Sequence, residues 1–295
     1  MSEILTADNI FANISNGYYY FTAAEKKVSE YVLEHKNDVQ YMSISELAEE
    51  CGVAEATISR FCRRLKLKGY NAFKLALAKA GVEESSGASA AGQAAQTETD
   101  TEENSLVELG RRVCSSHVTA LNQSLALLHP EHIKQAVDMM CGAERIYFMG
   151  QGGSMLISMV AANQFSSVSP RFFAVQDSHI QASTVALLSP KDVVVFFSYS
   201  GSTKELTEIM GLARNCGAKV ILITRFSKSP GAALADVVLQ CGSNEGPLQQ
   251  GSMPAKMAQL FVVDVLFQEF ARRDPSSAQR SRERIAEALT ERHLF

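Results

Sequence analysis

Two short turns rich in glycine and serine carry the side chains best suited to hold an anion. The first is Gly150-Gln-Gly-Gly-Ser154, and the second is Ser198-Tyr-Ser-Gly-Ser-Thr203. Glycines allow a backbone to approach a ligand closely, and the first turn of a following helix offers free N–H groups. The hydroxyls of the second turn add donors, so it can cradle an anion without a fixed lysine or arginine. The alternative interpretation is a serine-rich turn whose hydroxyls only cap a helix.

Alternating strands and helices are predicted around these turns. Val193-Val-Val-Phe-Phe197 is a continuous apolar run, typical of a strand buried on both faces. The pattern predicts a doubly wound α/β domain with a parallel five-stranded sheet, preceded by two helices. Ligands of such sheets bind beyond the carboxyl ends of the strands, where both turns lie. Strands are expected at 145–149, 171–175, 192–198, 219–224 and 237–241, and the preceding helices at 105–128 and 131–141.

Other phosphate and catalytic motifs fail at specific positions. A dinucleotide-binding fingerprint would need glycine where Met155 stands, and a G-x-S-x-G nucleophile elbow around Ser200 would need glycine at Ser198. A Walker A loop would need Gly-Lys-Ser/Thr, which the sequence lacks. The six cysteines are scattered without a C-x-x-C pair, which argues against a zinc finger. We therefore expect no cofactor and no metal.

The N-terminal region reads as helices with clear start signals. Thr22-Ala-Ala-Glu25 and Ser43-Ile-Ser-Glu46 match the capping box, in which hydroxyl and carboxylate satisfy the first free N–H groups of a helix. Gly52 is suited to end the second of these helices. A third helix is predicted over 55–65, with Ile58 among its core positions. Helix, glycine turn and helix together form the helix-turn-helix arrangement.

The third helix has a basic outer face that is suited to DNA. Residues 57–80 carry seven basic side chains and no acidic one, although the whole chain has a net charge of −4. Ala56, Arg60 and Arg63 lie opposite the apolar positions, flanked by Ser59. Arginine binds guanine edges or phosphates, and small residues permit close approach to a groove. A solvated basic face on an ordinary helical bundle is the alternative. Ala54 stands where a serine or threonine cap is expected.

The composition divides the 295 residues into two modules. Residues 83–104 are small, polar and acidic, and they predict a flexible linker because they cannot bury enough apolar surface to order themselves. We expect a DNA-binding domain over 1–82, an α/β domain over 105–275 and a helical tail over 276–295. No apolar run reaches the roughly 18 residues of a membrane span, and no signal peptide is evident, so a cytoplasmic location is expected.

The N-terminal motifs resemble the RpiR/MurR transcription regulators. The resemblance rests on Ser45-Glu-Leu-Ala48, Gly52-Val53, Ala56-Thr-Ile-Ser-Arg-Phe-Cys-Arg63 and Lys68-Gly-Tyr-Asn-Ala-Phe-Lys74. It implies an all-α helix-turn-helix domain that binds a double-stranded DNA operator. The expected DNA contacts are Ala56, Thr57, Ser59, Arg60, Arg63, Arg64 and Lys68.

The second module resembles the sugar isomerase (SIS) domain. The shared pattern comprises Gly150-x-Gly152-x-Ser154, Asp177-x-His179, Ser198-x-Ser-Gly-x-Thr203 and Ala258-Gln-Leu260. The resemblance implies binding of a sugar phosphate, with the phosphate at the serine-threonine turn. Ala255-Lys256 stands where family members often have Ser-Arg, which keeps the positive charge but loses a hydroxyl. The expected ligand contacts are Gly152, Ser154, His179, Ser198, Ser200, Gly201, Ser202, Thr203, Glu245 and Lys256.

Together the two resemblances imply a regulator of carbohydrate metabolism genes rather than an enzyme. We expect a repressor that works as a homodimer or homotetramer and responds to a sugar phosphate effector. The rival hypothesis is a phosphosugar isomerase or lyase with an appended helical domain. Such an enzyme needs a general base near the sugar, and the candidates are His179, Glu205 and Glu245.

Overall fold

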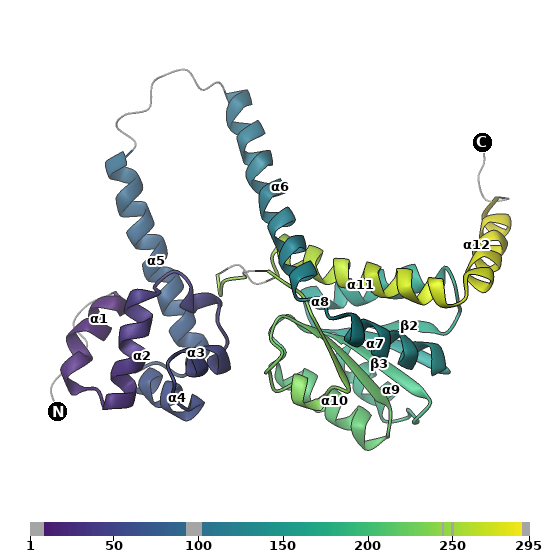
Figure 1. Ribbon diagram of the computed structural model, residues 1–295, viewed down its shortest axis with the longest axis horizontal. Coiled ribbons are helices and arrows are strands. Elements are labelled where there is room, and N and C mark those ends of the chain that lie inside the picture. The colour runs from purple at the N-terminus through teal and green to yellow at the C-terminus, as the bar shows by residue number, and fades with distance from the viewer. Residues whose placement is uncertain (1–8, 93–101, 244, 249–250, 291–295) are drawn as a thin grey trace. The chain divides into compact units, whose positions relative to one another are not determined.

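The computed structural model describes residues 9–92, 102–243, 245–248 and 251–290. The chain forms two compact units (Figure 1). Residues 1–111 with 244–250 belong to the first unit, and residues 112–243 with 251–295 belong to the second. The boundary therefore falls within a helix that follows the predicted linker.

The first unit is built from helices. They are α1 (Ile10–Gly17), α2 (Ala23–Glu34), α3 (Ile44–Glu50), α4 (Glu55–Arg64) and α5 (Tyr70–Gly92), with short 3-10 helices at Tyr18–Tyr20 and Val39–Tyr41. Both predicted capping boxes are confirmed, because Thr22 and Ser43 each exchange bonds with the glutamate three residues on. Ile58, Phe61 and Phe73 are fully buried in the core of this unit.

The turn between α3 and α4 closes as its sequence predicts. Gly52 has a φ of +60°, and its N–H donates to the Glu49 carbonyl over 3.0 Å. The next N–H, of Val53, reaches back to the Ala48 carbonyl over 2.9 Å. These two bonds satisfy the last carbonyls of α3 and turn the chain into α4. Ala54 provides no side-chain cap, as expected.

The segment predicted as a flexible linker is helical wherever the structure describes it. Residues 83–92 continue α5, and residues 102–104 open α6 (Glu102–Ala126). Ala88, Ala90 and Ala91 favour a helix over residues 83–92, because alanine has the highest helix propensity. The remainder of the predicted linker, 93–101, lies outside the described residues.

The second unit contains the predicted doubly wound sheet. Five parallel strands run in the order β2-β1-β3-β4-β5. They are β1 (Arg145–Gly150), β2 (Phe172–Val175), β3 (Asp192–Phe197), β4 (Lys219–Thr224) and β5 (Val237–Gln240), within one residue of the predicted bounds. The helices are α7 (Pro130–Gly142), α8 (Gly153–Ser166), α9 (Ser178–Val185), α10 (Lys204–Asn215), a 3-10 turn (Ala232–Leu234), α11 (Met253–Arg273) and α12 (Pro275–Thr290).

Helices cover both faces of this sheet (Figure 1). On β3, Val193 and Val195 face the core formed with α7, α8 and α11, whereas Val194 and Phe196 face α9 and α10. The alternation follows from the two-residue period of a strand. Burial on both faces explains why this strand reads as an unbroken apolar run.

The predicted C-terminal tail is the helix α12, and it belongs to the second unit. Ala278 is buried against the core formed with α7, α8 and α11. Ile285 and Leu289, two apolar residues further along α12, are 39% and 45% exposed. The helix is therefore anchored through its first turn rather than through its later apolar residues.

Candidate anion site and basic helix

The two glycine-serine turns begin from paired residues of neighbouring strands. Gly150 at the end of β1 is the register partner of Phe197 at the end of β3. The next residues along the chain are the first turn and the serine turn, each leading into a helix, α8 or α10. The sheet order reverses between these two strands, so the turns flank the crevice where ligands of doubly wound sheets bind.

The serine turn (Ser198–Thr203) is folded by its own hydroxyls. The Gly201 N–H donates to Ser198 Oγ over 3.1 Å, and the Ser202 N–H donates to Ser200 Oγ over 3.4 Å. Thr203 is the N-cap residue of α10, but its side chain makes no capping bond. Its Oγ1 atom is buried without a hydrogen-bond partner among the described residues. A buried hydroxyl left unpaired at a helix start is poised to bond an anion.

Gly201 cannot be replaced by a larger residue without disturbing this turn. Its φ of +61° is in the left-handed region. A Cβ at this position would lie 2.1 Å from Ser229 Oγ and 2.9 Å from Thr224 Oγ1. The Gly201 carbonyl also accepts a bond of 2.8 Å from the Gly231 N–H. The loop after β4 therefore fixes the serine turn from behind.

The first turn is shaped by Gly152, which has φ +53° and ψ −124°. The Ser154 N–H donates to the Gln151 carbonyl over 3.1 Å, which places Ser154 in the first turn of α8. Its side chain is half-buried. The N–H groups at the starts of α8 and α10 and the two helix dipoles all favour negative charge at this edge of the sheet.

Gln181, which sequence reasoning did not select, fixes the ends of β1 and β2. Its side chain is fully buried on α9, and its Nε2 donates to the carbonyls of Gly150 over 3.1 Å and Val175 over 2.7 Å. Its Oε1 accepts from Gln151 Nε2 over 2.8 Å. A buried glutamine on a short helix gave no signal in the sequence, because only the fold brings it to the strand ends.

Lys256 lies beside the first turn. Its Cε is 3.4 Å from where a Cβ on Gly153 would stand, and its Nζ donates to the Gly251 carbonyl. One turn further along α11, Gln259 is 3% exposed and its Nε2 has no hydrogen-bond partner among the described residues. The predicted lysine thus lies next to the crevice, and a buried amide donor lies on the same helix.

The structure gives less support for three of the predicted ligand contacts, His179, Glu245 and Ser202. His179 is exposed near the start of α9, where its N–H donates to Asp177 Oδ1 over 2.9 Å. Glu245 is in the segment 244–250 that groups with the first unit, so the second unit by itself does not include it. Ser202 is exposed at the outer side of the serine turn.

On α4 of the first unit, Ala56, Arg60 and Arg63 are exposed and Ser59 is half-buried, as the helical spacing predicts. Lys68, beyond the end of the helix, is also exposed. The four residues on α4 form one outer face that begins at the N-terminal turn, the end that helix-turn-helix proteins place against base edges.

Two of the residues expected to contact DNA have other roles in the fold. Thr57 is only 6% exposed, and its Oγ1 accepts a bond of 3.2 Å from Arg60. Arg64 donates to the Tyr20 carbonyl and pairs with Glu25 over 3.3 Å. The Glu25 side chain is buried and needs this cation, so Arg64 joins α4 to α2. The sequence spacing alone could not reveal this partner 39 positions away.

Comparison with known proteins agrees with both halves of this description. The helix-turn-helix domain of the rpiR family matches residues 8–84, and the SIS domain matches residues 139–268. An HTH-type transcriptional regulator of Caldanaerobacter subterraneus is 32% identical over 93% of this chain and 94% of its own. The HTH-type transcriptional regulator HexR of Pseudomonas aeruginosa is 30% identical over 95% of each chain.

A solved structure shares the whole architecture. The Vibrio vulnificus NanR protein, complexed with ManNAc-6P, superposes with a TM-score of 0.82 at 26% identity. The match covers 97% of this chain and all of that one. The fold and the two sites define a transcription regulator with a helix-turn-helix domain and a SIS domain. The chain belongs to the RpiR family of such regulators.

None of the helices formed by the described residues is long and apolar enough to cross a membrane. No group of three or more histidine, cysteine, aspartate or glutamate side chains within the described ranges could hold a metal ion.

Proposed function

We propose that this protein is a DNA-binding repressor whose affinity for its operator is set by a sugar phosphate bound at the serine turn. The unpartnered Thr203 hydroxyl carries the effector half of the proposal, because a phosphate oxygen at the start of α10 would satisfy it. The exposed Arg60 and Arg63 on α4 carry the DNA half. The phosphosugar bound to NanR supports the class of effector.

Regulation requires that the effector bind one conformational state more tightly than another. The phosphate would bridge the two turns, which start from the paired residues Gly150 and Phe197. The sugar would then extend towards Lys256 and Gln259 on α11. Closure of these elements on the ligand would change how the two DNA-binding units of an assembly are spaced.

We infer that the working assembly is a homodimer or a homotetramer built on the outer face of α8. Leu156 and Val160 are 51% and 47% exposed there, one turn apart, and Met159 is 36% exposed beside them. Operators of helix-turn-helix proteins have two half-sites about one helical turn apart, so a second copy is the partner that the DNA site demands. Leu156→Glu with Val160→Glu should yield monomers by light scattering and weaken DNA binding.

We also infer that the site binds its sugar phosphate without converting it. An isomerase or lyase needs a general base held by a partner. The imidazole of His179 has no hydrogen bond to the other described residues, and Glu205 is exposed in the first turn of α10. Phosphorus and carbon NMR of protein incubated with each effector candidate should detect no product, and turnover that disappears in His179→Asn would favour the enzyme hypothesis.

A gel-shift titration tests the division of labour between the two units. The probe is DNA from upstream of its own gene, at about 100 mM salt with competitor DNA, with and without sugar phosphates. Arg60→Ala with Arg63→Ala should abolish the shift but keep sugar phosphate binding. Lys79→Ala, an exposed lysine on α5, is the matched control.

The effector half needs the complementary pair of variants. Ser200→Ala with Thr203→Val should keep the shift and lose its response to the sugar phosphate. Thr207→Val is the control, because that hydroxyl lies one turn further along α10 and bonds only the Lys204 carbonyl among the described residues. Loss of both activities in either double variant would contradict the proposed division.

A further inference from the structure

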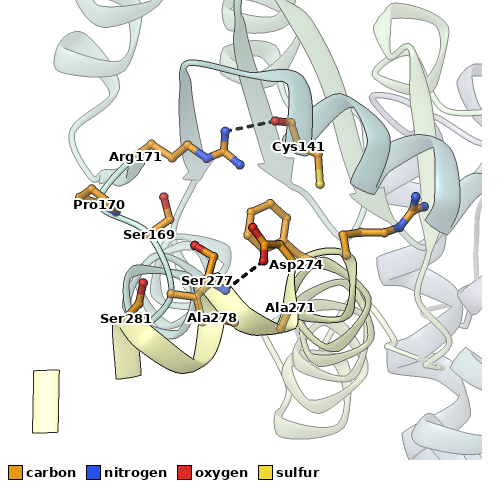
Figure 2. Close-up of a pocket in the computed structure, with 12 residues that line it drawn as sticks. Cys141, Ser169, Pro170, Arg171, Ala271, Asp274, Ser277, Ala278 and Ser281 are labelled. Atoms are coloured by element: carbon orange, nitrogen blue, oxygen red, sulfur yellow. Dashed lines mark hydrogen bonds between the residues drawn. The ribbon is translucent and has the colours of Figure 1, made fainter. Parts of the chain in front are cut away.

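A cavity (Figure 2) lies at the amino ends of the strands, away from the serine turn. Arg171 directly precedes β2, so the cavity is at the amino ends of the strands, whereas the serine turn is at their carboxyl ends. Its volume is about 540 Å³, within the usual range for small-molecule sites. Its walls come from α7, the α8–β2 loop, the end of α11 and the start of α12.

Arg171 is the cation of this cavity that has no carboxylate partner among the described residues. Its Nη1 donates to the carbonyls of Cys141 and Ala143 over 3.2 and 2.7 Å, at the end of α7. Its Nε is buried without a hydrogen-bond partner, and no carboxylate among the described residues forms an ion pair with it. Buried donors are normally paired, so this N–H is a candidate contact for a ligand.

Of the other charged groups in the lining, Arg273 is paired with carboxylates, whereas Asp274 bonds a backbone N–H. Arg273 contacts Asp138 over 3.0 Å and Glu269 over 2.7 Å. Asp274, the one carboxylate on the lining, accepts a bond of 2.9 Å from the Ser277 N–H and so caps α12. Arg171 is therefore the cation of the lining without a carboxylate partner among the described residues, and Asp274 is the carboxylate of the lining without a cation.

The remaining lining provides hydroxyls and an aromatic ring. The Arg171 guanidinium lies 5.4 Å from the ring centre of Phe270. Figure 2 shows Arg171 reaching towards Cys141, with Ser277 and Ser281 on α12 across from it. Together with Ser169 these serines offer hydroxyl donors, and none of the three hydroxyls is bonded to another described residue.

We propose that this cavity is a second ligand site, which binds a small organic anion with an apolar portion. The phosphate or carboxylate head would pair with Arg171 and accept bonds from the serine hydroxyls. The apolar portion would lie against Phe270. The site is independent of the serine turn and of the effector proposed for it.

Calorimetric titration of the full-length protein with phenyl phosphate and with benzoate tests this site. The Ser200→Ala, Thr203→Val background keeps phenyl phosphate from the serine turn. We expect saturable binding of one probe molecule per chain by at least one of the two probes. Arg171→Gln should weaken it at least tenfold, whereas Arg284→Gln, which removes an exposed charge from α12 outside the cavity, should leave it unchanged.

A second variant separates binding from folding, because Arg171 also holds the end of α7. Ser277→Leu fills the cavity and leaves the contacts of Arg171 with Cys141 and Ala143 in place. It should weaken probe binding at least tenfold with an unchanged melting temperature. Two results would overturn the proposal. One is that neither probe binds saturably. The other is that Ser277→Leu, together with Arg171→Gln where that variant folds, binds the probe as tightly as the parent protein does.

Discussion

Gly201 and Ser229 are packed so tightly that the serine turn tolerates no side chain at its glycine. A Cβ on Gly201 would come within 2.1 Å of Ser229 Oγ. Ser229 cannot easily retreat, because its Oγ accepts a bond of 3.3 Å from the Ala232 N–H. The loop after β4 thus sets the shape of the anion cradle, although none of its residues was expected to contact the ligand.

Gly201→Ala should therefore reduce sugar phosphate binding at least tenfold and destabilise the second unit by about 1–3 kcal/mol. The substitution would place alanine at a left-handed φ and bring its Cβ into a clash with Ser229. Urea unfolding and calorimetry with the identified effector measure the two effects. Gly211→Ala on α10 is the matched control, because a Cβ there meets nothing within 4 Å. Normal binding by Gly201→Ala would show that the turn is more plastic than its packing implies.

Asp192 makes acid stability depend on a buried carboxylate that is paired with the half-exposed Arg145. Arg145 holds it through two bonds of 2.8 and 2.9 Å, and the Ser189 N–H adds a third. Burial would raise the pKa of Asp192, but the hydrogen bonds from Arg145 and Ser189 outweigh it and hold the pKa below its usual value. The stabilisation is thus present above pH 4 or so and is lost as the pH falls through the folded-state pKa.

Asp192→Asn should cost about 1–3 kcal/mol at pH 7, because it weakens the bonds that the buried Asp192 carboxylate accepts from Arg145 and Ser189. The variant should also lose the part of the acid dependence that comes from this group. Urea unfolding from pH 2.5 to pH 7 checks both expectations. Asp138→Asn serves as the control, since that carboxylate is 52% exposed and pairs with Arg273 at the surface. Equal acid profiles for Asp192→Asn and the parent would contradict the assignment.

Lys74 should make the stability of the first unit rise with pH in the alkaline range. Burial lowers the pKa of this half-buried lysine to about 8, although Glu46 acts to raise it. The folded state then disfavours the charged form that the unfolded chain keeps up to about pH 10.4. Stability contributed by this group is lowest below pH 8 and rises as the pH increases from there.

Lys74→Met should raise the stability of the protein at pH 7 by about 1 kcal/mol and remove this rise. The difference between variant and parent is the quantity to measure, because buried tyrosine and cysteine groups titrate in the same range. Lys79→Met is the control, because Lys79 is exposed on the same helix. A variant less stable than the parent at pH 7 would mean that the ammonium group is needed by its neighbours.

The cysteines should react with a thiol reagent in an order set by burial. Cys114 is exposed on α6 and should react first. Burial raises the pKa of Cys51 to about 11 and that of Cys62 to about 12, so both should remain unmodified at pH 8 until the first unit unfolds. Mass spectrometry of timed samples identifies the sites, with Cys114→Ser as the reference. Rapid modification of Cys62 would show that α4 opens readily.

Local chemistry predicted much of the fold before any contact was known. The capping boxes at Thr22 and Ser43 depend on residues three positions apart, and the sequence displays both partners. The apolar run of β3 reports burial on both faces of a sheet. The helical ends of the predicted linker are the exception. Their acidic and polar composition indicated a flexible segment, although the alanines of residues 83–92 favour a helix.

The polar residues of the candidate anion site could be proposed from the sequence, whereas the residues that support the two turns could not. Ser198 to Thr203 are contiguous, so their spacing already implies a turn at a strand end. Gly231 lies far from that turn in the sequence, and only the packing of the loop after β4 brings it there. Gln181 reaches the first turn and the ends of β1 and β2 only through the packing of α9. The ion pair of Arg64 with Glu25 was unpredictable for the same reason, because Glu25 is on another helix.

The sequence by itself determined the helix starts, the strands and the glycine turns, because these depend on near neighbours along the chain. The tertiary structure alone decided that Thr57 is buried and that Ser229 packs against Gly201. It also decided that the buried Nε of Arg171 has no hydrogen-bond partner among the described residues. Each of these depends on residues distant in sequence, whose distances and burial are set only when the helices and the sheet pack together.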